Sequence, residues 1–119
     1  MKTSSAKSKG RELQKWLCKM WTEVFHLDEG DCVSRPMGSA GVDAMMSPKA
    51  RRLIKISPEM KNTKVFPSVG ALKQSQANKY EGTIAAVVWK PHGKGFDNSI
   101  IYFNAKEFSE WLEEQLNGS

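Results

Sequence analysis

Apolar residues recur at spacings of three and four near both ends of the chain, a pattern typical of amphipathic helices. The first stretch predicts a helix over Ser8–Phe25. Its apolar stripe consists of Leu13, Trp16, Leu17, Met20, Trp21 and Val24. Near the other end, Asn104 can cap a last helix, with Glu107 as its capping-box partner. The stripe expected to be buried there consists of Phe108, Trp111, Leu112 and Leu116.

Short apolar runs between these helices predict strands. Thr83–Trp89 is almost continuously apolar, which indicates a strand buried on both faces. We expect it to form a hairpin with Ile100–Phe103, with a basic, glycine-rich tip between them. Val42–Met46 is predicted as a short strand, and another short strand is expected near Asp31–Ser34, within the long connection His26–Gly41.

The stretch Ile54–Lys61 is predicted as a strand with two unlike faces. Alternation places the polar residues on one face and the apolar residues on the other. The polar set is Lys55, Ser57, Glu59 and Lys61, and the apolar set is Ile54, Ile56, Pro58 and Met60. Proline gives no N–H to a ladder, so Pro58 implies either a bulge or pairing on one side only. Ser47 and Pro48 should start a short helix before this strand, and Ser68 should cap a helix over Val69–Lys79.

The length of 119 residues predicts one domain, with residues 1–7 mobile. No run of 18 apolar residues occurs, so no membrane span is expected. The net charge of +5 is uneven: residues 105–119 carry one Lys and four Glu, a balance of −3, which leaves +8 for the rest. A basic body with an acidic last helix indicates a polyanionic partner on one side.

Cysteine usage favours a reducing compartment, which we take to be the cytoplasm. Cys18 and Cys32 fit no metal-ligand spacing. Cys18 lies beside the apolar stripe of its helix, so core packing is favoured over a reactive thiol.

Three polar residues suggest a chemical site. Glu59 and Lys61 share one face of the predicted strand, and Asp43 stands on a neighbouring strand. Two carboxylates and an amine suit a hard divalent cation that activates water. The competing interpretation is that Asp43 is a turn residue and Glu59–Lys61 a surface ion pair of little energetic value.

The same residues carry a resemblance. Asp43 followed by Glu59-Met60-Lys61 resembles the Asp…Glu-x-Lys core of the PD-(D/E)xK nuclease superfamily. Lys9-Gly10-Arg11-Glu12 resembles the N-terminal helix motif of its Holliday-junction-resolvase branch. From Ala6 onward the chain is similar to small phage-encoded endonucleases of this type. It departs from their pattern at Val42, where the motif has proline, and at Pro58.

The resemblance implies an α/β fold with a restriction-endonuclease-like core: a central mixed sheet of about four to five strands flanked by helices. It implies Mg²⁺, with Mn²⁺ able to substitute. The implied metal ligands are Glu12, Asp43, Glu59 and the backbone carbonyl of Met60. Asp43, Glu59, Lys61 and Gln74 are the implied catalytic residues. Asn78 shares a helix face with Gln74, and Gln76 competes with Gln74 for the glutamine position.

Basic and hydroxyl side chains around this site are candidates for holding DNA phosphates. They are Lys9, Arg11, Arg35, Ser39 and Lys94. A plain connecting loop around Arg35 and a solvated hairpin tip around Lys94 are the competing interpretations.

The favoured function is a magnesium-dependent DNA endonuclease, structure-selective and Holliday-junction-resolvase-like, with a role in DNA recombination. Opposed cuts require two sites, so a homodimer is expected, through Trp16 or Trp21 or the hairpin. If phage-encoded, it would act in the host cytoplasm. The alternatives are a non-specific, flap or nicking nuclease of the same superfamily, or a non-catalytic DNA-binding protein on the same fold.

Overall fold

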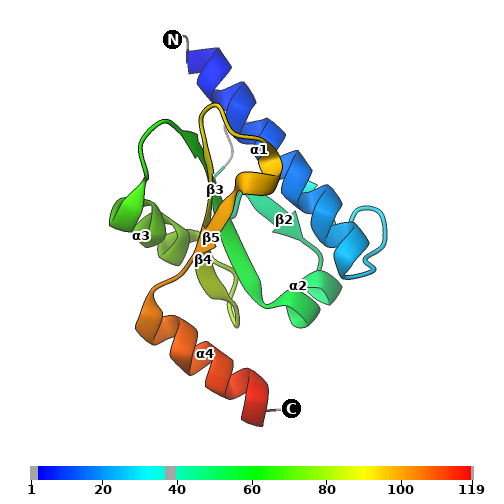
Figure 1. Cartoon of the computed structure of the whole chain (residues 1–119). Helices are drawn as coiled ribbons and strands as arrows, with labels where there is room; N and C mark the ends of the chain where they lie inside the picture. Colours follow the sequence, from blue (N-terminus) through cyan, green and yellow to red (C-terminus); the bar gives the residue numbers. More distant parts are fainter. Residues whose placement is uncertain (1–2, 37–39, 119) are drawn as a thin grey trace.

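A mixed three-stranded sheet and a separate two-stranded ribbon form the centre of the fold (Figure 1). The computed structural model describes residues 3–36 and 40–118, and their side chains from Ser8 onward. In chain order the elements are α1 (Thr3–Val24), β1 (Cys32–Ser34), β2 (Ala44–Met46), α2 (Pro48–Ile54), β3 (Ile56–Thr63), α3 (Ser68–Asn78), β4 (Ile84–Pro91), the 3₁₀ turn η1 (Phe96–Asn98), β5 (Ile100–Tyr102) and α4 (Ala105–Asn117).

The three-stranded sheet has the order β3-β4-β5. β3 and β4 run parallel in unbroken register from Ile56↔Ile84 to Thr63↔Pro91, and α3 makes the crossover that a parallel pair requires. β5 pairs antiparallel with β4, so the predicted hairpin is confirmed. β3 is therefore an edge strand of this sheet.

Helices cover both faces of this sheet. α1 packs on one face, in a core that includes Leu13, Met60 of β3 and Val88 of β4. α3 packs on the other face, where Leu72 contacts Val87 and its neighbours. Successive residues of β4 thus point into different cores, which confirms the prediction of a strand buried on both faces.

The expectation of one central sheet of four to five strands is met only in its coarser part, an α/β fold with a mixed sheet. β1 and β2 pair antiparallel with each other, from Cys32↔Met46 to Ser34↔Ala44, and they join neither β3 nor β5 in a ladder. β2 lies near β3, but no ladder of backbone hydrogen bonds joins the two strands. A side chain forms the link instead, as described below.

The strand predicted over Ile54–Lys61 begins two residues late, because the preceding helix extends further than expected. Ser47 accepts a hydrogen bond from the Ala50 N–H at 3.1 Å, and Pro48 starts α2, as predicted. The helix ends at Ile54, and Lys55 adopts a left-handed conformation with φ of 58°. Lys55 therefore terminates the helix instead of joining the polar face of β3.

Two other helix starts also differ from prediction. α1 begins at Thr3 rather than Ser8, so the helix includes part of the segment expected to be mobile. Ser68 is the first residue of α3, and Pro67 holds the cap position without a side-chain hydrogen bond. No helix in the part of the chain that the structure describes is long and apolar enough to cross a membrane.

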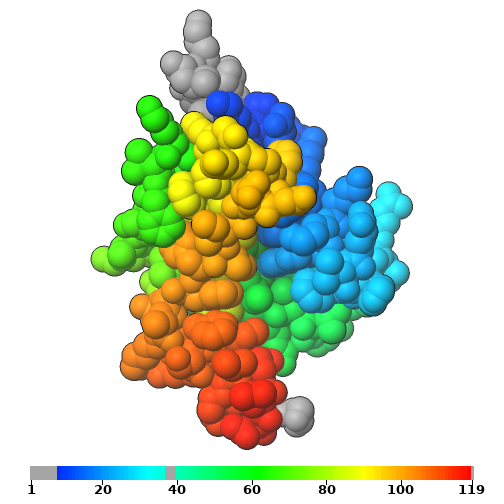
Figure 2. Space-filling view, viewed as in Figure 1, coloured from blue at the N-terminus to red at the C-terminus, as the bar shows by residue number. Residues whose placement is uncertain are grey.

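The apolar stripe of α4 is not buried, contrary to prediction. No residue of α4 is buried, and both Leu112 and Leu116 are exposed. Figure 1 shows why: α4 lies beyond one end of the small sheet rather than across it, and Figure 2 shows it forming that end of the molecule. The Asn104 cap is confirmed, since its side chain accepts from the Glu107 N–H at 3.0 Å.

A buried serine of α3 bridges the two parallel strands. The Ser75 hydroxyl donates to the Ser57 carbonyl at 3.1 Å and accepts from the Ala86 N–H at 3.2 Å. We expect Ser75→Ala to lower the free energy of unfolding by about 1–2 kcal/mol, because it removes both bonds in a dry environment. Urea unfolding measures this change. Ser109→Ala is the control, since the Ser109 hydroxyl is exposed and should matter by less than about 0.5 kcal/mol.

Candidate active site

Asp43 reaches the free edge of β3 through a loop that Arg35 closes. The Arg35 N–H donates to the Asp43 carbonyl at 2.9 Å, and its Nε donates to the Val42 carbonyl. Gly41, with φ of 123°, leaves space for the guanidinium, since a Cβ there would lie 2.8 Å from it. Arg35, which was predicted to hold phosphate, therefore bonds the backbone on which Asp43 stands.

The Asp43 carboxylate replaces a neighbouring strand along this edge. Its Oδ2 accepts a hydrogen bond from the Met60 N–H at 2.8 Å. Backbone groups of residues two apart point to the same edge of a strand, so the nitrogen of Pro58 also faces this side. Proline has no N–H to leave unpaired there, and the register of β3 with β4 has no bulge. Of the two sequence-based explanations for Pro58, one-sided pairing is therefore confirmed.

Glu59 lies next to Asp43 with its side chain only 5% exposed. The two carboxyl groups interact with each other, and Asn78 of α3 also interacts with Glu59. Burial, and then the Asp43 charge, raise the pKa of Glu59 to about 7. Burial also raises the pKa of Asp43, although the Met60 N–H opposes that effect. Glu59 therefore takes up a proton at a higher pH than an exposed glutamate would.

Lys61 completes the cluster from the same strand face as Glu59. Its Nζ lies 4.0 Å from Glu59 Oε2 and donates to Gln74 Oε1 at 3.2 Å. Gln74 and Asn78 therefore both turn toward the site from α3, as their spacing predicted. Gln76 does not, because its Nε2 donates to both carboxylate oxygens of Glu107 on α4, at 3.0 and 3.1 Å.

Asp43 and Glu59 are the carboxyl groups of this cluster that could hold a hard divalent cation, since a cation favours the charged form of each. The Met60 carbonyl points to the same edge as its N–H, so it adds a third oxygen. Among the described residues, no group of three or more His, Cys, Asp or Glu side chains converges. Glu12 does not join Asp43 and Glu59 in this structure.

Glu12 instead lines a basic pocket of about 360 Å³ at the end of β3, where Lys9 and Lys94 also lie. Asn62, the residue after Lys61, holds two other residues of this pocket. Its Nδ2 donates to the Lys9 carbonyl at 3.2 Å, and its own carbonyl contacts His92 Nε2 at 3.0 Å. The remaining lining residues are Lys90, Gly93, Gly95 and Phe96.

The other predicted DNA-binding residues lie apart from this pocket. Arg11 lines a different pocket, together with Lys15 and Lys19. It stands two positions after Lys9 on α1, and residues two apart on a helix point in different directions. Ser39 lies outside the described residues. Sequence reasoning did not assign Asn62 or Lys90 to a site. The only signal for Asn62 was that the residue after Lys61 must point to the opposite face of β3.

The tryptophans of α1 that were proposed for a dimer interface make contacts within the chain. Trp21 belongs to the α1 core, so its assignment to an interface was wrong. Trp16 is half-buried and stacks on Phe96 with ring centroids 5.6 Å apart. On the hairpin, Ile100 and Ile101 of β5 are 49% and 42% exposed.

Comparison with known proteins adds no further assignment. No family model, no curated protein and no solved structure matches the chain.

Proposed function

We propose that the protein is a metal-dependent DNA endonuclease. The observation that supports this best is the convergence of Asp43, Glu59 and Lys61 from two separate segments, with Gln74 and Asn78 added from a third. Most of these side chains are held by contacts within the cluster. A simple surface ion pair between Glu59 and Lys61 would not place a buried carboxylate next to a second carboxylate.

Each residue has a distinct role in this proposal. Asp43, Glu59 and the Met60 carbonyl would hold Mg²⁺ or Mn²⁺, which supplies charge neutralisation at the phosphodiester and acidifies water. Lys61, held by Gln74, stands where it can orient the attacking water or exchange a proton with it. Asn78 fixes the Glu59 carboxyl. Arg35 acts indirectly by holding the Asp43 loop.

The surface around the site suits a polyanion. Lys9, Lys90 and Lys94 line the pocket at the end of β3, and the acidic α4 lies beyond the other end of the sheet (Figure 1). A nucleic acid strand would have to pass from the carboxylate pair around the end of β3 to meet this positive charge on the α1 face of the sheet. The excess positive charge of the chain body is consistent with this path.

Lys94→Ala should weaken DNA binding several-fold and reduce the slope of log K against log salt by about 0.9. Removing one phosphate contact releases one fewer counterion, so the effect should be the same for all DNA sequences. Fluorescence anisotropy over a salt series measures it. Lys106→Ala is the matched control, because Lys106 pairs with Glu110 on α4 at 2.7 Å and should leave both quantities unchanged.

The preference for branched DNA and the homodimer rest on the resemblance to Holliday junction resolvases. The exposed Ile100 and Ile101 on the edge strand β5 are the apolar residues of the hairpin left for a second copy. A non-catalytic DNA-binding protein is the second candidate. It is favoured by the Met60 N–H, which already occupies one Asp43 oxygen, and by the separate position of Glu12.

Cleavage of three labelled substrates separates these possibilities: a four-way junction, a flap and a linear duplex, each with Mg²⁺ or with excess chelator. Cutting confined to the junction supports the resolvase-like activity. Equal cutting of all three supports a non-specific nuclease. Binding without cutting in either Mg²⁺ or Mn²⁺ supports the non-catalytic protein, and cutting that persists in chelator contradicts the metal-dependent mechanism.

A further inference from the structure

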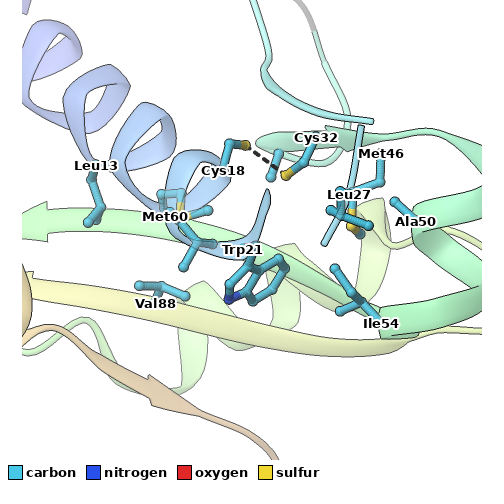
Figure 3. Packing of buried hydrophobic residues seen from close by; sticks show 12 residues of the cluster. Leu13, Cys18, Trp21, Leu27, Cys32, Met46, Ala50, Ile54, Met60 and Val88 are labelled. Atoms are coloured by element: carbon cyan, nitrogen blue, oxygen red, sulfur yellow. Dashed lines mark hydrogen bonds between the residues drawn. The ribbon is translucent and has the colours of Figure 1, made fainter. Parts of the chain in front are cut away.

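The two cysteines lie in contact although 14 positions separate them in the sequence. Cys18 of α1 and Cys32 of β1 share an S–H···S hydrogen bond, with the sulfurs 2.9 Å apart. Figure 3 shows the two thiols pointing toward each other at the border of the α1 core. Both thiols are reduced in this structure, and their side chains are almost fully buried.

A pocket of about 560 Å³ reaches both cysteines from the surface. Its size is within the range of small-molecule sites. Charged residues of both signs surround it: Arg11, Lys15, Lys19, Glu23 and Glu29. Such a lining suits a small peptide that carries both carboxylate and ammonium groups.

The contact between the two thiols shifts their pKa values in opposite directions. The hydrogen bond between the two thiols lowers the pKa of Cys32, whereas the same bond and burial raise the pKa of Cys18. One thiolate is thus formed more easily and is stabilised by the proton of its neighbour. A thiolate with a second thiol in contact is the arrangement that thiol–disulfide exchange requires.

We propose that Cys18 and Cys32 form a redox-active pair that small peptide disulfides oxidise to an intramolecular disulfide. The Cys32 thiolate attacks one sulfur of the peptide disulfide, which forms a mixed disulfide and releases one peptide thiolate. Cys18 then loses its proton to solvent and attacks the Cys32 sulfur, which releases the second peptide thiol. Two protein thiols are oxidised, and one peptide disulfide is reduced to two thiols.

Little structural change is needed for this product. The sulfurs must approach by about 0.9 Å to reach the S–S bond length of about 2.05 Å. The new bond would join α1 to β1 and close a loop of about 15 residues, which should raise Tm by about 10 °C. This inference is independent of the proposed nuclease activity.

The test uses the folded wild-type protein, oxidised glutathione as the probe, and intact mass after quenching and alkylation. We expect the loss of two hydrogens, no alkylation of either thiol, no lasting glutathione adduct, and a higher Tm than after dithiothreitol treatment. Two thiols that stay open to alkylation after quenching and unfolding, or a stable glutathione adduct on the wild type, would overturn the proposal.

Two single variants test the order of the steps. Cys18→Ser should stop at one glutathione on Cys32, because the resolving thiol is absent. Cys32→Ser should react at least about tenfold more slowly, because Cys18 loses the partner that makes exchange possible. Equal reaction of both variants contradicts the assignment of roles. Should either variant fail to fold, the wild-type mass measurement decides the proposal by itself.

Discussion

Replacing Asp43 with asparagine should lower the metal-dependent cleavage rate by about 1,000-fold or more while leaving the fold intact. Asparagine has nearly the same shape and keeps an Oδ acceptor for the Met60 N–H, so the edge of β3 stays covered. It removes the negative charge that would hold the cation, and charge stabilisation of this kind is worth several kcal/mol in the transition state. Initial rates on labelled DNA with Mg²⁺ measure the loss.

Asp97→Asn is the matched control for this experiment. Asp97 is an exposed carboxylate in η1, so its replacement changes the net charge by the same amount and should leave the rate within about twofold. Circular dichroism and Tm establish that both variants are folded. An Asp43→Asn variant that keeps more than a tenth of the wild-type rate would exclude Asp43 as a metal ligand.

Replacing Glu59 with glutamine should stabilise the metal-free protein near pH 8 and have little effect near pH 4. The pKa of Glu59 is raised in the folded protein to about 7, above its unfolded value of about 4.3. The carboxyl is neutral in both states below the unfolded pKa, so it costs nothing there. As pH rises through the window up to about 7, the unfolded state ionises more easily and the free energy of unfolding falls.

Glutamine imitates the protonated carboxyl and removes this penalty. With solvent screening taken into account, we expect Glu59→Gln to raise the free energy of unfolding by about 1–2 kcal/mol at pH 8. Urea unfolding in excess chelator at several pH values measures the difference, and the exposed Glu81→Gln is the control. A difference that does not change with pH would contradict the raised pKa of Glu59.

Adding Mn²⁺ provides a readout of the same site that is independent of activity. A cation that binds the folded state alone raises Tm by mass action. We expect such a rise for the wild type and none for Glu59→Gln or Asp43→Asn. A rise of equal size in all three proteins would place cation binding elsewhere in the chain.

The sequence predicted the elements whose patterns are local. The 3.6-residue period identified α1, the continuous apolar run identified β4, and the Ser47–Pro48 pair identified the start of α2. Lys55 was misassigned because a left-handed residue after a helix has no pattern signal when it is not glycine. The apolar period of α4 is real, but periodicity does not reveal whether a sheet is wide enough to cover it.

The candidate site was predictable only in part, for a similar reason. Strand alternation placed Glu59 and Lys61 on one face, and the helix period placed Gln74 and Asn78 together. That Asp43 meets β3 through a side chain rather than as a ladder partner depends on the closure of its loop by Arg35. Contacts such as this one, or that between Cys18 and Cys32, depend on how separate elements pack, which the spacing of residues does not indicate.

Pro58 has a consequence for the behaviour of the protein at high concentration. An exposed strand edge normally offers a row of unpaired donors to any passing chain and so invites aggregation. On this edge of β3 the proline offers no donor, and the Met60 N–H is already bonded to Asp43. This edge of β3 therefore offers another protein molecule few free backbone donors with which to add a strand.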